Sequence, residues 1–319
     1  MHLRCAVLDD FQAVATSLAD WGPVLDRVEV VSFPEHFGTE DELVQAVRDF
    51  DIIVTLRERV SFPASTLDRL PRLTLLVASG MRNSVIDFAA AARNDVTVCG
   101  TKSSSTPPVE LTWALLLGLA RGIVTENATL RGGGPWQSTV GVDLHGSRLG
   151  LLGLGKIGSR VAQVGLAFGM NVVAWSQNLT EQRAKEHGVQ LAASKEELLS
   201  SSDFVSVHLA LSDRTRGLLG APELALLKPS AYLVNTSRAA IVDQGALLDV
   251  LREGRIAGAG VDVFDIEPLP GDHPMRTAPR LLATPHLGYV SQHNYRTYYS
   301  QAVEDIEAFL AGSPVRRLG

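Results

Sequence analysis

The hydrophobic residues of this chain form short continuous runs, separated by longer segments in which apolar residues recur every three or four positions. A run that is apolar at consecutive positions is typical of a strand buried on both faces of a parallel sheet. The longer segments have the spacing of amphipathic helices that cover such a sheet. The pattern therefore predicts an α/β fold built from doubly wound parallel sheets.

The predicted strands fall into two groups. The first group is Leu3–Leu8, Val28–Phe33, Ile52–Leu56, Leu73–Ala78 and Val96–Cys99. The second group is Arg148–Leu152, Met170–Trp175, Asp203–Leu209, Ala231–Asn235, Gly258–Val263 and Leu281–Thr284. Between the groups, the Ser/Thr/Pro-rich stretch Lys102–Pro108 predicts a hinge and a domain boundary. A length of 319 residues is consistent with two domains.

Three helical segments carry further information. Thr39 and Glu42 have the spacing of a capping box, with Thr39 as the N-cap. The segment from Val109 to about Val124 is apolar on nearly every side, so we expect it to be covered by another domain or by a second subunit. The last helix, roughly Ser291–Ala311, is expected to return to the first domain.

One glycine-rich stretch stands between an apolar strand and a helical pattern. It reads Gly-x-Gly-x-x-Gly, with Gly153, Gly155 and Gly158 at the three glycine positions. In this order, the first glycine permits a sharp turn, the second permits close approach of a pyrophosphate, and the third permits tight helix–strand packing. The N–H groups at the start of the following helix can bind phosphates. The stretch predicts a dinucleotide site, although the motif without its context could be a surface turn.

Composition and charge narrow the classes of partner. The net charge of −6 shows no basic footprint for nucleic acid or for an anionic membrane surface. No run approaches the ~18 apolar residues that a membrane span needs. Cys5 and Cys99 lie inside apolar runs, so we expect buried free thiols in a reducing compartment. With no secretory signal pattern at the start, the expected location is the cytoplasm.

Polar residues follow three of the later predicted strands. These stretches are Asn235–Arg238, Asp262–Pro268 and Thr284–Gly288. An arginine can hold a carboxylate in a fork of two N–H bonds, a histidine can transfer a proton near neutral pH, and a nearby glutamate can orient that histidine. Taken singly, each stretch has an ordinary structural explanation as a surface charge or a turn. Together they suit reduction of a 2-keto acid.

In the order and spacing of these motifs, the chain resembles the D-isomer-specific 2-hydroxyacid dehydrogenase family, in its phosphoglycerate dehydrogenase-like branch. The resemblance implies a flavodoxin-like substrate-binding domain at residues 1–100 and 288–319, and an inserted Rossmann NAD(P)-binding domain at residues 101–287. It implies that Arg238 binds the substrate carboxylate, that Glu267 supports the histidine, and that His286 is the acid/base. The implied cofactor-binding residues are Gly153, Gly155, Lys156, Ile157, Gly158, Ser176, His208, Thr236, Asp262 and Gly288.

The chain departs from that family in a loop of the first domain. Gly80-Met81-Arg82 stands where the family usually has Gly-x-Gly, so Arg82 replaces a small residue. We expect Gly80, Met81 and Arg82 to bind substrate, with Arg57 after the preceding strand. Arg82, together with Arg57, would bind a second anionic group of the substrate. The alternative is that these arginines form ion pairs with Glu58 or Asp87.

Two further expectations concern the cofactor and the class of function. After the strand ending at Trp175, Ser176 takes the place of the acid that normally binds the ribose 2′-OH of NAD. We therefore expect use of both NAD(H) and NADP(H) with a slight preference for NADP(H). The favoured function is hydride transfer between NAD(P)H and a small 2-keto or D-2-hydroxy acid by a homodimer. The alternative is a dinucleotide-sensing, corepressor-like binding protein on the same fold.

Overall fold

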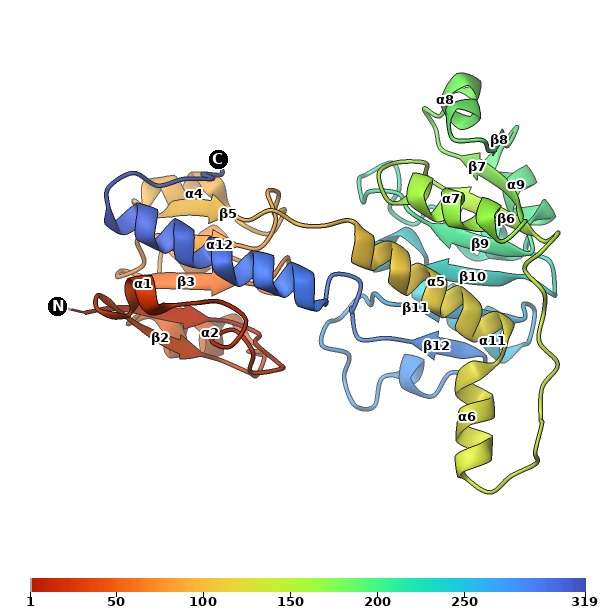
Figure 1. Cartoon of the computed structure of the whole chain (residues 1–319), viewed down its shortest axis with the longest axis horizontal. Coiled ribbons are helices and arrows are strands. Elements are labelled where there is room, and N and C mark those ends of the chain that lie inside the picture. Colours follow the sequence, from red (N-terminus) through yellow and green to blue (C-terminus); the bar gives the residue numbers. More distant parts are fainter. Residues whose placement is uncertain (1) are drawn as a thin grey trace. The chain divides into compact units, whose positions relative to one another are not determined.

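The computed structural model describes residues 2–319 and divides them into two compact units. Unit 1 contains the residues up to Ser104 together with Val290–Gly319, and unit 2 is Ser105–Tyr289. Each unit is built on its own parallel sheet (Figure 1). The structure therefore confirms the predicted α/β class with two parallel-sheet domains.

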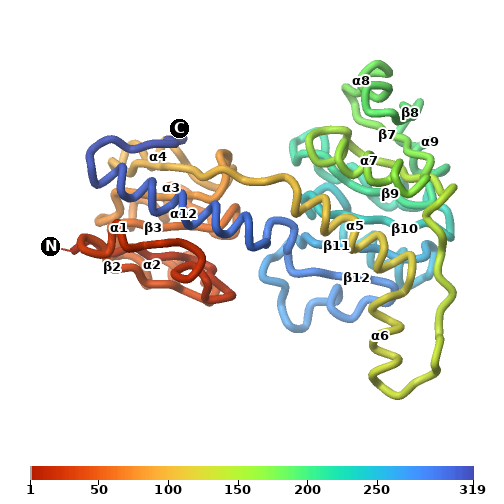
Figure 2. Tube along the Cα trace, viewed as in Figure 1, coloured from red at the N-terminus to blue at the C-terminus, as the bar shows by residue number. Residues whose placement is uncertain are grey.

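Unit 1 has a five-stranded sheet in the order β2-β1-β3-β4-β5, and every pair is parallel. Its strands are β1 (Leu3–Val7), β2 (Val28–Ser32), β3 (Ile52–Thr55), β4 (Leu75–Ala78) and β5 (Thr97–Gly100). Its helices are α1 (Gly22–Leu25), α2 (Glu40–Val47), α3 (Ala64–Leu67), α4 (Phe88–Arg93) and α12 (Gln292–Leu310). One apolar layer joins α2, α3 and α4 to the sheet. The C-terminal helix α12 lies beside α1 (Figure 2), and it also contacts β4.

Unit 2 has a seven-stranded parallel sheet in the order β12-β11-β10-β9-β6-β7-β8. The strands are β6 (Arg148–Leu152), β7 (Asn171–Trp175), β8 (Gln190–Leu191), β9 (Phe204–Val207), β10 (Tyr232–Asn235), β11 (Gly258–Val261) and β12 (Leu281–Ala283). The helices are α5 (Thr106–Ala120), α6 (Ile123–Arg131), α7 (Gly158–Ala167), α8 (Glu181–Glu186), α9 (Lys195–Ser201), α10 (Ala221–Leu224) and α11 (Gln244–Arg252), with short 3-10 turns η1 (Ala239–Ile241) and η2 (Pro274–Arg276). Helices α5 and α7 cover one face, and α9 to α11 cover the other.

The predicted strands agree with the observed ones to within two residues at each end. The single strand that the pattern did not predict is β8, which has only two residues and both of them exposed. A strand of that length has no run of apolar side chains that could reveal it. The capping box at Thr39 and Glu42 and the buried free thiols of Cys5 and Cys99 are confirmed.

The long apolar helix differs from its prediction in two ways. It begins at Thr106 and ends at Ala120, because Gly122 adopts a left-handed φ of 58° and the chain bends by 62° into α6. Packing inside unit 2 also buries most of it, against β10, β11, β12 and α7. The expectation that another domain or subunit must cover this helix was therefore wrong, since the surrounding sheet and α7 cover it.

By length and apolar composition, no individual helix of residues 2–319 qualifies as a membrane span, whereas α5 and α6 taken together pass that test as a bent pair. Helix α6 has no buried residue, unlike α5. The loop after α6 is also exposed as far as Asp143. This segment carries the exposed apolar side chains of Ile123, Val124, Leu130, Trp136, Val140 and Val142.

Candidate active site

The order of strands in the sheet of unit 2 reverses at one point, between β6 and β9. From β6 the chain proceeds outward to β7 and β8, and then returns to β9 on the other side of β6. The strand order therefore reverses between β6 and β9. In open parallel sheets, ligands bind beyond the carboxyl ends of the strands at such a reversal. The residues that follow these two strands are the Gly153 loop and His208.

The glycine loop has the geometry that a pyrophosphate needs. Gly153 has a φ of 102°, which only glycine adopts without strain, and a Cβ there would lie 2.8 Å from the His208 carbonyl oxygen. A Cβ on Gly158 would lie 2.1 Å from the Gly153 carbonyl oxygen, so helix α7 can pack here only with glycine. A Cβ on Gly155 would meet nothing within 4 Å, which leaves open space beside the loop. Lys156 is exposed beside it, and the N-cap residue Ile157 begins α7.

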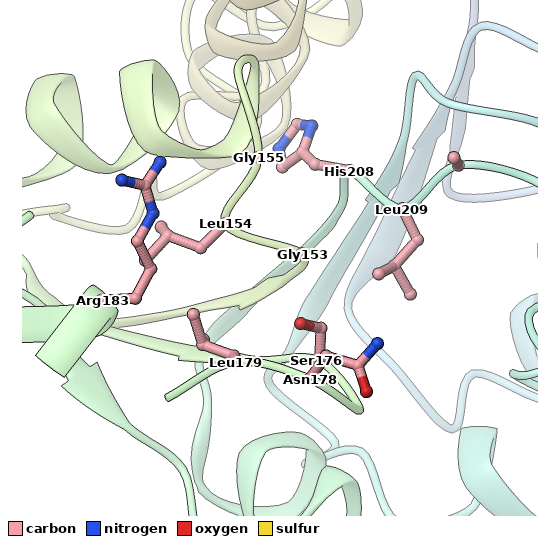
Figure 3. Close-up of a pocket in the computed structure, with 10 residues that line it drawn as sticks. Gly153, Leu154, Gly155, Ser176, Asn178, Leu179, Arg183, His208 and Leu209 are labelled. Carbon is pink, nitrogen blue, oxygen red and sulfur yellow. The ribbon is translucent and has the colours of Figure 1, made fainter. Parts of the chain in front are cut away.

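A cavity of about 340 Å³ lies at this loop (Figure 3). The residues that line it come from the ends of β6, β7 and β9 and from α8. They are Gly153, Leu154, Gly155, Ser176, Asn178, Leu179, Arg183, His208, Leu209 and Ala210. The cavity thus combines a glycine cradle, an apolar wall and one arginine. These features fit a dinucleotide, whose phosphates would lie against the helix N-terminus and whose adenosine would lie between the apolar side chains.

The surroundings of His208 favour its neutral form. Burial lowers the pKa of its imidazole to about 4. Its Nε2 lies 2.9 Å from the hydroxyl of Ser206, so the ring has a hydrogen-bond partner without needing a charge. A neutral, oriented imidazole can line a cofactor cavity, but it cannot supply a proton at neutral pH.

A second histidine lies at the carboxyl end of β12 and is paired with a carboxylate. The His286 Nδ1 lies 2.6 Å from Glu267 Oε2. Both side chains are about one quarter exposed, at 24% and 27%. The other carboxylate oxygen of Glu267 accepts a hydrogen bond of 2.8 Å from the backbone N–H of Phe264. Because both oxygens of Glu267 are engaged, His286 Nδ1 has a fixed partner and its Nε2 is the atom left for proton transfer.

The loop that carries His286 is tied to the sheet by Asp262. This carboxylate is fully buried after β11 and accepts bonds from the Thr284 hydroxyl at 2.6 Å, the Leu287 N–H at 2.7 Å and the Gly288 N–H at 2.8 Å. Burial raises the pKa of Asp262 in spite of these bonds. His286 itself has a φ of 52°, an uncommon conformation for histidine. The bonds on either side of it to Asp262 hold the loop in that strained shape.

The loop after β10 presents Arg238 and Thr236. The side-chain amide of Asn235 bridges this loop, donating to the Arg238 carbonyl at 3.0 Å and accepting from the Ser237 N–H at 3.0 Å. Arg238 Nη1 donates to the Ser237 carbonyl at 2.9 Å. The Thr236 and Thr112 hydroxyls lie 2.8 Å apart. Arg238, Glu267 and His286 thus each follow a strand at the same edge of the unit 2 sheet.

The predicted substrate residues of unit 1 follow β3 and β4. Arg57 has a φ of 56°, and its backbone N–H donates to the Ser79 hydroxyl at 2.7 Å. Gly80 has a φ of 98°, and a Cβ there would lie 2.4 Å from Arg57 Nη1, so glycine leaves room for the guanidinium. Met81 and Arg82 are exposed. Among residues 2–319, neither Arg57 nor Arg82 takes part in an ion pair, so the alternative pairings with Glu58 and Asp87 are absent.

Within residues 2–319, no group of three or more His, Cys, Asp and Glu side chains could hold a metal ion. The site of unit 2 presents a glycine loop beside a cavity, and a histidine paired with a glutamate. Fold and site together define an α/β protein of the dinucleotide-binding class.

A family model described as "D-isomer specific 2-hydroxyacid dehydrogenase, NAD binding domain" matches residues 113–288. The chain belongs to this family and is an NAD-binding oxidoreductase of it. It is 38% identical to a glyoxylate reductase of Aeropyrum pernix over 85% of this chain and 83% of that protein. It is 35% identical to a D-3-phosphoglycerate dehydrogenase of Bacillus subtilis over 91% of this chain, yet spans only 54% of that relative. The structure matches a phosphoglycerate oxidoreductase from Vibrio cholerae with a TM-score of 0.92 and 36% identity, covering 98% of this chain and 100% of that one.

Several residues of the site were absent from the sequence-based set. Asn178 and Leu179 line the cavity, as does Arg183, which the sequence had offered together with Lys185 only as a cation a turn of helix beyond the missing acid. Asn235 holds its own loop through side-chain bonds to Arg238 and Ser237, and Thr284 donates to Asp262 after the neighbouring strand β11. The position of both residues after apolar runs was visible, but the partner of Thr284 depends on the order of strands in the sheet.

Two glycine substitutions separate cofactor binding from folding. Gly155→Ala adds a methyl group in open space, so it should fold normally and lower NAD(P)H affinity by about tenfold or more, by filling the space that a pyrophosphate needs. Gly158→Ala forces a methyl group against the Gly153 carbonyl and should lower the free energy of unfolding by about 1–3 kcal/mol. Fluorescence titration with NAD(P)H and denaturant unfolding measure both. Normal cofactor affinity in Gly155→Ala would place the dinucleotide elsewhere.

Proposed function

We propose that this protein transfers a hydride between NAD(P)H and a small 2-keto acid, forming the D-2-hydroxy acid or oxidising it. The observation that carries the proposal is the bond of 2.6 Å between His286 and Glu267, at the strand edge that also bears Arg238. The names of the relatives support this substrate class, because they include glyoxylate reductases and phosphoglycerate dehydrogenases. The unpaired Cys5 and Cys99 are consistent with the cytoplasm as its compartment.

In this mechanism four side chains of unit 2 bind the substrate, transfer the proton or position the groups that do so. Arg238 binds the substrate carboxylate and keto oxygen, which orients the carbonyl and withdraws charge from it. His286 donates a proton from Nε2 to the keto oxygen during reduction and takes it back during oxidation. Glu267 holds His286 through Nδ1 and stabilises its positive charge. Asp262 keeps the loop with His286 in position and lies close to the expected place of the nicotinamide. The bound dinucleotide supplies the hydride.

Loss of the acid/base pair tests the proposal directly. His286→Ala should lower kcat for keto acid reduction by about 10²- to 10⁴-fold, because a general acid contributes about that much. Glu267→Gln should lower it less, since histidine remains. Reduction needs the protonated imidazole and oxidation needs the neutral one, so reduction should be favoured at lower pH and oxidation at higher pH. Cofactor absorbance with a panel of 2-keto acids measures all three effects.

The exposed His145 offers a control, because His145→Ala removes a histidine of unit 2 without touching this site. Near wild-type turnover in His286→Ala would overturn the assignment of the acid. A wild-type protein that binds NAD(P)H but turns over no 2-keto acid would instead support the dinucleotide-sensing alternative.

The cofactor preference follows from the end of β7. Ser176 lacks the carboxylate that would repel a 2′-phosphate. Arg183 lines the same cavity. Its Nη1 lies 3.5 Å from Glu186 Oε2, and both of these side chains are exposed on α8. We propose that both cofactors are used, with a slight preference for NADP(H). Arg183→Ala should lower kcat/KM with NADPH by about tenfold and leave NADH unchanged. Lys185→Ala is the control, and a wild-type preference for NADH above ~100-fold would contradict the proposal.

The substrate is proposed to carry a second anionic group, bound by Arg82 with Arg57. Both guanidinium groups lie beyond the carboxyl ends of unit 1 strands, and neither is neutralised by an ion pair within residues 2–319. Met81 would contribute its backbone N–H to the substrate, and Gly80, whose own N–H donates to the Thr101 hydroxyl at 3.1 Å, would shape the loop. A charge-assisted contact contributes roughly 10- to 150-fold in affinity. Arg82→Ala should therefore lower kcat/KM for a keto acid with a distal carboxylate or phosphate by that factor, and leave glyoxylate nearly unchanged.

Arg93→Ala serves as the control. It removes an arginine of unit 1 that is already paired, because Arg93 Nη2 lies 3.2 Å from Asp68 Oδ1. Equal losses for glyoxylate and for the longer substrate in Arg82→Ala would show that Arg82 does not recognise a distal group. Steady-state kinetics with matched NADPH concentrations decides between the two outcomes.

The protein is proposed to be a homodimer, joined through the exposed apolar surface of α6 and the loop after it. Trp136 is 81% exposed and Val140 is 98% exposed, which is unusual for large apolar side chains on a free surface. A second copy of this chain would cover them, since a self-complementary patch is the common basis of dimers. Trp136→Ser with Val140→Ser should shift the protein toward monomer by about 30-fold or more in dissociation constant.

Light scattering after size-exclusion chromatography over a dilution series measures this shift. Leu226→Ser changes a partly exposed apolar residue elsewhere on unit 2 and should leave the dimer intact. A wild-type protein that is monomeric at micromolar concentration would end the proposal.

A further inference from the structure

The segment between β11 and Glu267 is supported by a side chain from a different helix. Gln244 is the first residue of α11, and it is only 8% exposed. Its Nε2 donates to the Val263 carbonyl at 3.1 Å, and its Oε1 accepts from the Asp265 N–H at 3.3 Å. The amide therefore binds the two peptide groups as the backbone of a neighbouring strand would.

These two bonds also affect Glu267, because Phe264, the residue between Val263 and Asp265, donates its N–H to Glu267. In a trans peptide group the C=O and the N–H point in opposite directions. Because the Val263 carbonyl accepts from Gln244, the N–H of the same peptide group, that of Phe264, is directed away from Gln244, and it donates to Glu267 Oε1 at 2.8 Å. Glu267 Oε2 is then the oxygen that meets His286 Nδ1.

We propose that Gln244 is a positioning residue for the acid/base pair, acting through the backbone at Phe264 and through Glu267. The inference rests on the proposed function, in which His286 transfers the proton. An uncharged amide supplies both a donor and an acceptor here, whereas a carboxylate has no donor for the Val263 carbonyl and a thioether has no donor and is only a weak acceptor. The side-chain bonds of Gln244 go to the backbone of Val263 and Asp265, so this residue sets the orientation of Glu267 rather than the chemistry itself.

The test is a double-mutant cycle between Gln244→Met and Glu267→Gln. Methionine has nearly the same shape as glutamine but forms neither bond, so Gln244→Met should lower kcat for 2-keto acid reduction by about tenfold. The KM for NADPH should stay unchanged, because the cavity at the Gly153 loop is not altered. In the Glu267→Gln background, Gln244→Met should cause little further loss, because the group that it positions is already impaired.

Gln163→Met is the matched control, since the exposed Gln163 also donates its Nε2 to a backbone carbonyl, that of His187 at 2.9 Å. It should leave kcat unchanged. If Gln244→Met does not fold, Gln244→Glu keeps the acceptor for the Asp265 N–H and should show a smaller loss of kcat with the same dependence on Glu267.

Three results would overturn the inference: losses that multiply in the double variant, a rise in KM for NADPH equal to the fall in kcat, or wild-type kcat in Gln244→Met. The last result, with strong losses in Glu267→Gln and His286→Ala, would leave the proposed function standing and remove only the role of Gln244. Wild-type kcat in Glu267→Gln and His286→Ala would remove both.

Discussion

The position of the loop that carries His286 depends on one buried carboxylate, that of Asp262. It is inaccessible to solvent, and burial of a charge is costly unless hydrogen bonds compensate for it. Three donors do so, and all three belong to the loop from Thr284 to Gly288. The loop is therefore fixed to the end of β11 by bonds that would be expensive to break. This fixation explains how His286 can keep a backbone conformation that histidine rarely adopts.

The cofactor end of the site depends on a different constraint, which is steric. Gly153 and Gly158 are required because backbone atoms approach too closely for a Cβ at either position. Gly155 is different, since nothing in the protein occupies the space beside it. Gly153 and Gly158 thus stabilise the strand–turn–helix unit, and Gly155 leaves room for a ligand. One motif therefore serves both the fold and the binding of the dinucleotide.

Much of the fold could be predicted from the sequence because buried parallel strands leave a direct signal in continuous apolar runs. The two sheets and the glycine loop were found in this way, and the motif residues Arg238, Glu267 and His286 were located after the correct strands. The end of α5 was misplaced, because Gly122 in a run of good helix formers does not reveal that it will adopt a left-handed conformation. The role of Gln244 could not be found at all, because its partners lie about twenty residues away and depend on how α11 packs.

The distribution of ion pairs adds an electrostatic argument about the ligands. The chain has a net charge of −6, although its expected substrate and cofactor are both anions. Across residues 2–319, many arginines are neutralised locally, such as Arg72 by Asp51 and Arg148 by Glu197. Within the described part of the chain, Arg57, Arg82 and Lys156 take part in no such ion pair, and all three follow the carboxyl ends of parallel strands. A local positive potential at these ends can attract an anion even when the whole molecule is negative, because salt screens the more distant charges within about 10 Å.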